Sequence, residues 1–223
     1  MRSGGFLCVC LLVLLINPFS HLQAEKSPGE KSAFRNPDLV EPVKLDPTFR
    51  LDIRYATTNN FVGRAVYTEA RAFLQRPAAE ALVRVNKTLR KKGYGLIIFD
   101  GYRPQHVTKI FWDAMPAHQK KFVADPDVGS VHSRGCAVDL TLMDLKTEHA
   151  IQMPSEFDEW TERSRIDFRG GTEESRCLRD LLRTSMETEG FLHCELEWWH
   201  YTYKDWEEYA VEDVRFSEIS STR

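Results

Sequence analysis

The stretch Ser130–Asp139 constrains this chain most, because it places a histidine and an aspartate seven residues apart where a strand should begin. From residue 137 to 142 apolar residues alternate with other residues, which predicts a strand with Asp139 facing away from its apolar side. Gly135 would let the backbone turn and bring His132 back over the start of that strand. The stretch therefore predicts half of a metal site, with His132 and Asp139 as ligands.

The rest of the metal site is expected in residues 195–201, a second aromatic-rich strand pattern. His200 would be the third ligand, and the nearby Glu197 would be a general base. Three protein ligands leave the fourth position of a tetrahedral Zn²⁺ open for water, which is the arrangement of a hydrolase. The alternative is that these histidines and carboxylates are ordinary loop and strand-edge polar residues.

One geometric conflict arises within the second stretch. On a regular strand Glu197 and His200, three residues apart, point to opposite faces. Both can serve one ion only if a bulge or the end of the strand lies between them. We therefore expect an irregularity in the backbone at this point.

Three motifs together carry a resemblance to a known family. They are S-x-H-x-x-G-x-A-x-D at residues 130–139, E-W-W-H-Y at 197–201 and D-G-Y-R-P at 100–104. In this order they resemble the zinc D-alanyl-D-alanine dipeptidases of the VanX type. Similar stretches upstream and downstream extend the resemblance to about Leu45–Tyr203.

The resemblance implies a role for each matching residue. The family's zinc ligands, one ion per chain, match His132, Asp139 and His200, and its catalytic base matches Glu197. Arg103 matches the arginine that stabilises the negative oxygen of the tetrahedral intermediate. The residues implied in substrate binding are Tyr55 and Asp158, for the free ammonium, and Ser130, for the other polar groups.

The order of the elements predicts an α+β fold: a small, mainly antiparallel sheet with helices packed on one face and the zinc site on the other. Strands are expected at 49–55, 96–99, 137–142 and 195–201, and helices at 77–93, after 104 and after Thr172. The resemblance implies the same fold. The pattern alone leaves an α/β fold open.

The two ends of the chain are expected to lie outside the domain. Residues 1–24 are interpreted as a signal peptide, with Arg2, an apolar run at 6–16 and Ala24 at the cleavage site. Residues 25–44 should be a flexible spacer, 45–215 a single zinc dipeptidase domain, and 216–223 a loose tail. The signal predicts export to the periplasm or secretion.

Charge and cysteine content narrow the choice of partners. With a net charge of −3, the chain lacks the excess of positive charge that is typical of nucleic-acid-binding proteins. We expect no stable membrane association once the signal is cleaved. Of the cysteines that remain, Cys136, Cys177 and Cys194, we expect all three to be unpaired, while a Cys177–Cys194 disulfide is the alternative.

The predicted function is zinc-dependent hydrolysis of the dipeptide D-Ala-D-Ala to two D-alanines, in salvage or remodelling of cell-wall peptides. One alternative is a D,D-carboxypeptidase or endopeptidase of the same zinc fold, which acts on longer peptidoglycan stems. Another is a zinc-binding module without catalysis. The presence of Glu197 and Arg103 argues against the module, because a structural metal site needs neither.

Overall fold

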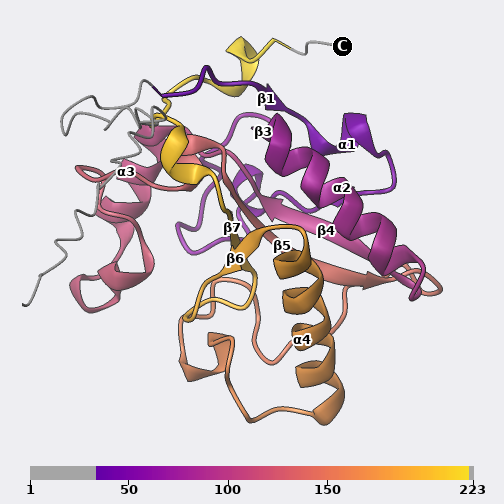
Figure 1. The fold of residues 1–223 in the computed structure, drawn as a ribbon. Coiled ribbons are helices and arrows are strands. Elements are labelled where there is room, and N and C mark those ends of the chain that lie inside the picture. The colour runs from indigo at the N-terminus through magenta and orange to yellow at the C-terminus, as the bar shows by residue number, and fades with distance from the viewer. Residues whose placement is uncertain (1–33, 221–223) are drawn as a thin grey trace, which may run out of the picture. The chain divides into compact units, whose positions relative to one another are not determined.

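The computed structural model describes residues 34–220, and Figure 1 shows their fold. The described strands are β1 (Leu39–Val40), β2 (Arg50–Leu51), β3 (Leu74–Gln75), β4 (Tyr94–Asp100), β5 (Ala137–Asp144), β6 (Phe191–His193) and β7 (His200–Tyr203). The described α-helices are α1 (Pro42–Leu45), α2 (Arg76–Arg90), α3 (Gln105–Ala114) and α4 (Glu173–Thr188).

A five-stranded sheet with the order β2-β4-β5-β7-β6 forms the centre of the fold. Among the described strands of this sheet the β2–β4 pair alone is parallel, and β4 pairs with β5 from Tyr94 opposite Asp144 to Asp100 opposite Asp139. The pairs β5–β7 and β6–β7 are antiparallel as well. The predicted α+β class with a mainly antiparallel sheet is therefore confirmed.

Helices α2 and α4 pack on one face of this sheet (Figure 1). Helix α2 buries an apolar stripe that includes Leu82, Val85 and Leu89, as its sequence period predicts. Thr172 caps α4 by accepting a hydrogen bond from the Ser175 N–H. The phenol of Tyr201 on β7 lies near charged side chains of α4, so its neighbour His200 faces the opposite side. Helices α2 and α4 thus lie on the face of the sheet opposite to the candidate zinc ligands. Helix α3 does not, since its Phe111 lines the same pocket as His132, so the prediction that the helices pack on one face holds only for α2 and α4.

The prediction that residues 25–44 form a flexible spacer is wrong for the part that includes β1 and α1. Strand β1 pairs with β3, with Leu39 opposite Gln75. Val40 and Glu41 are buried, and Glu41 accepts a 2.7 Å hydrogen bond from Arg71. The strand pairing and the bond from Arg71 that order this segment come from residues thirty or more positions away, so its local composition did not predict them. Residues 25–33 lie outside the described part.

The prediction of a loose tail from residue 216 is also wrong at its start. The side chain of Phe216 is buried against Tyr67 and Phe73, with ring centroids 4.9 and 5.3 Å apart. Residues 221–223 and the predicted signal peptide 1–24 lie outside the described residues. Within residues 34–220, no helix combines the length and the apolar character that crossing a membrane requires.

Two of the expected strands are shorter than predicted. The 49–55 pattern gives only the two-residue β2, after which Arg54–Ala56 form a single turn of 3₁₀ helix. The 195–201 pattern contributes only its end to β7. The described cysteines are free: Cys136 is buried, Cys194 is half-buried and Cys177 is exposed.

Candidate metal and catalytic site

His132, Asp139 and His200 bring three potential metal-ligand atoms together. Nε2 of His132 lies 3.1 Å from Nδ1 of His200, and that nitrogen lies 3.0 Å from Oδ1 of Asp139. The third side of the triangle, from His132 Nε2 to Asp139 Oδ1, measures 3.5 Å. Four ligands at about 2.0–2.2 Å around a tetrahedral zinc are separated by about 3.3 Å, so this triangle has the right size for Zn²⁺.

The backbone explains why these side chains converge. Asp139 on β5 and His200 on β7 are directly paired across the antiparallel ladder, so their side chains leave the sheet on the same face. His132 begins a short 3₁₀ helix that ends at Arg134 and is capped by Gly135, whose φ of 70° lies in the left-handed region. The turn that Gly135 allows returns His132 over the start of β5, as the sequence predicted.

The hydrogen bonds of the two imidazoles leave lone pairs on the two nitrogens that face each other. Nδ1 of His132 lies 2.8 Å from the Gly101 carbonyl, which can only accept, so this nitrogen carries the proton and Nε2 carries the lone pair. Nε2 of His200 can donate to the Thr202 hydroxyl at 3.1 Å, which leaves the lone pair on Nδ1. Two lone pairs and a carboxylate oxygen then face a common point, a donor set that a divalent cation would satisfy. We conclude that the residues present fit zinc.

Asp139 is ready to act as an anionic ligand. Burial by itself would raise its pKa, but the neighbouring His132 and His200 outweigh that effect and hold the pKa well below the usual range. The carboxyl group is therefore ionised at neutral pH.

Glu197 lies in the turn between β6 and β7 and not on a regular strand. Because the strand begins only at His200, Glu197 and His200 do not have to point to opposite faces of the sheet, and the predicted conflict does not arise. The Trp160 indole N–H donates to the Glu197 carboxylate at 3.1 Å. Burial raises the pKa of Glu197 to about 7; the nearby His200 lowers it and Asp139 raises it. A carboxylate with this pKa can both take and release a proton near neutral pH.

Arg103 follows β4 and is a buried cation. Its Nη2 and Nε donate to Oδ2 of Asp100 at 2.7 and 3.1 Å, and its Nη2 lies 4.0 Å from Oδ2 of the candidate ligand Asp139. The guanidinium also lies over the ring of Phe111, 4.5 Å from the centroid. The side chain is thus held beside the ligand set with a fixed positive charge.

Tyr55 and Asp158 form a pair on another wall of the site. The Tyr55 hydroxyl donates to Oδ2 of Asp158 at 3.0 Å, and Asp158 has a left-handed φ of 60°. Burial raises the pKa of Asp158 well above its usual value, and the charges of Asp139 and Glu197 raise it further. Arg103 lowers this pKa but does not outweigh those effects, so a positively charged ligand at Asp158 would stabilise its ionised form.

A cavity of about 280 Å³ joins all these groups. It is lined by each of the residues proposed from the sequence, namely Tyr55, Arg103, Ser130, His132, Asp139, Asp158, Glu197 and His200. The Ser130 hydroxyl oxygen accepts from the His132 backbone N–H at 3.1 Å, so it also shapes the ligand loop. The structure therefore brings together residues that are spread over more than 140 positions of the chain.

Sequence reasoning missed two residues that contact this site. Trp160 lines the cavity and bonds to Glu197, and its indole packs against Phe61 and Phe122. Its only sequence signal was its place two residues after Asp158. Asp100, the partner of Arg103, opens the D-G-Y-R-P motif, but no role was assigned to it.

Comparison with known proteins identifies a matching family and similar proteins from bacteria. A family model described as D-ala-D-ala dipeptidase matches residues 36–220. A D-alanyl-D-alanine dipeptidase of Escherichia coli (strain K12) is 35% identical over 182 residues, which cover 81% of this chain and 92% of that protein. A D-alanyl-D-alanine dipeptidase of Enterococcus faecium is 36% identical over 177 residues, 70% of this chain and 86% of that protein.

Among solved structures, the D,D-pentapeptidase VanY of a VanB-type resistance cassette, in complex with Zn(II), is 19% identical to this chain. Its TM-score is 0.38, and the match covers 61% of this chain and 75% of that one.

Proposed function

The chain belongs to the D-Ala-D-Ala dipeptidase family, and from that premise we propose that it hydrolyses the dipeptide D-Ala-D-Ala to two D-alanines, with zinc held by His132, Asp139 and His200. The observation that carries the proposal is the position of Glu197. Its carboxylate lies in the same cavity as the three ligands but outside the ligand set, and a bond from Trp160 holds it there. A structural metal site would have no use for such a group.

Zinc, when bound, supplies Lewis acidity, which acidifies a water molecule and polarises the peptide carbonyl. Glu197 takes the proton of that water and gives it to the amine that leaves, and its raised pKa of about 7 suits both transfers. Arg103 places a permanent positive charge beside the ligands, where negative charge develops on the carbonyl oxygen. Its burial makes that charge more effective than it would be in water.

Asp158 and Tyr55 bind the ammonium group of the dipeptide. A free dipeptide carries an ammonium close to the bond that is cleaved, and this cation would stabilise the charged form of the half-buried Asp158. Tyr55 donates to Asp158 and fixes its orientation. Ser130, on the loop that carries His132, is assigned to the remaining polar groups of the substrate.

The proposed setting is outside the cytoplasm, in salvage or remodelling of cell-wall peptides. This part rests on the signal-like residues 1–24 of the sequence. A secreted enzyme of this kind would meet D-Ala-D-Ala released from peptidoglycan stems and not the intracellular precursor.

The test is a comparison of substrates on the zinc-loaded protein. We expect turnover of D-Ala-D-Ala, no turnover of L-Ala-L-Ala, and kcat/KM for N-acetyl-D-Ala-D-Ala lower by roughly tenfold to a hundredfold. Acetylation removes the ammonium and leaves Asp158 unpaired in the cavity, a loss of about 1–3 kcal/mol. Asp158→Asn should reduce the ratio of kcat/KM for D-Ala-D-Ala to kcat/KM for the acetylated substrate, mainly through poorer turnover of the dipeptide. Equal or better cleavage of the acetylated substrate by the wild-type protein would favour a D,D-carboxypeptidase instead.

A further inference from the structure

Asp100 connects Arg103 to a part of the molecule outside the cavity. The side chain is 1% exposed and is not among the three ligands. Its Oδ2 accepts both bonds from Arg103, whereas its Oδ1 accepts from the Gly101 N–H at 2.9 Å and from the Tyr67 hydroxyl at 2.7 Å. The orientation of the Asp100 carboxylate therefore sets the direction of the guanidinium.

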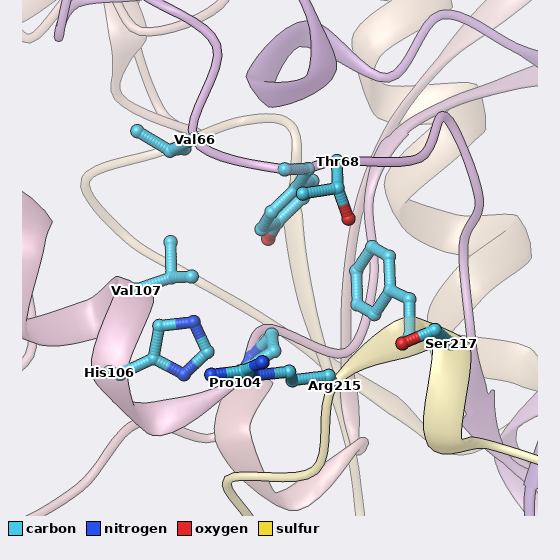
Figure 2. A pocket seen from close by; sticks show the side chains of 9 residues that line it. Val66, Thr68, Pro104, His106, Val107, Arg215 and Ser217 are labelled. Atoms are coloured by element: carbon cyan, nitrogen blue, oxygen red, sulfur yellow. The ribbon is translucent and has the colours of Figure 1, made fainter.

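Tyr67 comes from the loop that precedes β3 and is 7% exposed. Burial and the charge of Asp100 raise the pKa of its hydroxyl well above the usual value, so it remains protonated and donates. Its ring contacts Tyr55 edge-on at 5.8 Å, and it lines a second pocket of about 310 Å³. Figure 2 shows that pocket between the Val66–Thr68 segment and the start of α3 at His106.

The backbone between Asp100 and Arg103 is held rigidly. The Gly101 carbonyl accepts the His132 Nδ1 proton at 2.8 Å, and the Tyr102 N–H donates to the Phe73 carbonyl at 2.7 Å. A Cβ at Gly101 would lie 2.7 Å from the Phe73 carbonyl oxygen, which is too close for any other residue. With the main chain fixed, rotation of the Asp100 carboxylate is the remaining freedom at this point.

We propose that Tyr67 is a positioning residue for Arg103 and acts through Asp100. The inference rests on the proposed function, since it assigns Arg103 to the developing negative charge. Without the Tyr67 hydroxyl, Oδ1 of Asp100 keeps only the Gly101 N–H and the carboxylate can turn away from its present plane. The guanidinium turns with it, because two of its N–H groups bond to Oδ2. Arg103 keeps its charge but loses its fixed direction.

A purely structural role for Tyr67 predicts something different, and Tyr102 offers a matched control. Tyr102 is 1% exposed, packs against the same Phe216 ring, and its hydroxyl bonds to the backbone of Val214 and not to Asp100. Tyr67→Phe and Tyr102→Phe therefore each remove one buried hydroxyl. Only the first removes a bond to Asp100.

Both variants are compared with the wild-type protein for zinc content, melting temperature, kcat and KM on D-Ala-D-Ala. For Tyr67→Phe we expect about a tenfold lower kcat, KM within about twofold, and unchanged zinc. The variant loses the bond to the charged Asp100, and this loss reaches the reacting atoms only through Arg103. Tyr102→Phe should keep the wild-type kcat. An unchanged kcat in Tyr67→Phe, or an equal fall in both variants, would overturn the proposal.

A second readout does not depend on turnover. The Nε–H of Arg103, assigned in ¹⁵N-arginine NMR spectra from its disappearance in Arg103→Lys, should exchange with solvent slowly in the wild type and in Tyr102→Phe. In Tyr67→Phe it should exchange at least several times faster. Equal exchange in all three would overturn the proposal even in an active enzyme. An inactive wild-type protein with the expected exchange pattern would instead overturn the proposed function alone.

Discussion

Asp139 and His200 stand directly opposite each other on β5 and β7, with Oδ1 and Nδ1 3.0 Å apart. Two of the three proposed zinc ligands are thus held by the hydrogen-bonded ladder at the centre of the sheet, and only His132 depends on a loop. Rigid strands place ligands more reproducibly than loops do. The ligand geometry is therefore largely formed before any metal binds.

Removal of a ligand should release the metal. We expect about one zinc per chain in the wild-type protein, and loss of most of it in His200→Ala, because two remaining ligands hold zinc poorly. Elemental analysis of the purified proteins measures this. Glu197→Gln is the control, since the base is not a ligand: it should keep its zinc and lose roughly a hundredfold or more in kcat. A full zinc complement in His200→Ala would contradict the assignment.

The pH dependence of stability should reveal Glu197 in the zinc-free protein. Its pKa is raised by burial to about 7 in the folded state, from an ordinary value of 4.5. The folded protein therefore binds this proton more tightly than the unfolded chain does. That stabilisation is complete below pH 4.5 and is lost as the pH rises through about 7, a change on the order of 3 kcal/mol.

Glu197→Gln cannot ionise and should remove this dependence. Relative to wild type, the zinc-free variant should gain free energy of unfolding as the pH rises from about 4.5 to 8. Urea denaturation at several pH values measures the difference. Parallel pH profiles for the two proteins would mean that Glu197 titrates normally.

The indole of Trp160 should matter to the rate. Trp160→Phe removes the 3.1 Å bond to Glu197 but keeps an aromatic ring against Phe61 and Phe122. We expect kcat to fall about tenfold with little change in KM, since the base loses its orientation. Steady-state kinetics measure both constants. Trp112→Phe is the control: Trp112 packs against the edge of the core and under Lys120 and does not line the cavity, so both constants should stay unchanged.

Expression of the whole chain in a bacterium tests the proposed export. We expect the protein outside the cytoplasm, with Glu25 as its new N-terminus, because the cleavage pattern ends at Ala24. Cell fractionation and N-terminal sequencing give the answer. A cytoplasmic protein that retains Met1 would refute export and would allow the enzyme to act on the intracellular dipeptide.

Together with the family resemblance that its motifs carry, the sequence determined the α+β class, the helices at α2, α3 and α4, and the eight site residues that line one cavity. The pattern alone left an α/β fold open. Periodicity reports which face of an element is buried, and the three motifs supplied the ligand types and their spacing. Even the conflict between Glu197 and His200 was visible as a required break in the strand.

Only the tertiary structure decided how those groups are held. The bond from Trp160 to Glu197 spans 37 residues and that from Tyr67 to Asp100 spans 33, and neither follows a local pattern. The same reason explains the two errors at the ends of the domain. Val40 and Phe216 lie in segments that look polar or terminal in the sequence, yet both are buried by residues that the fold brings from elsewhere. Local sequence encodes which faces an element can bury, and long-range packing selects the partners.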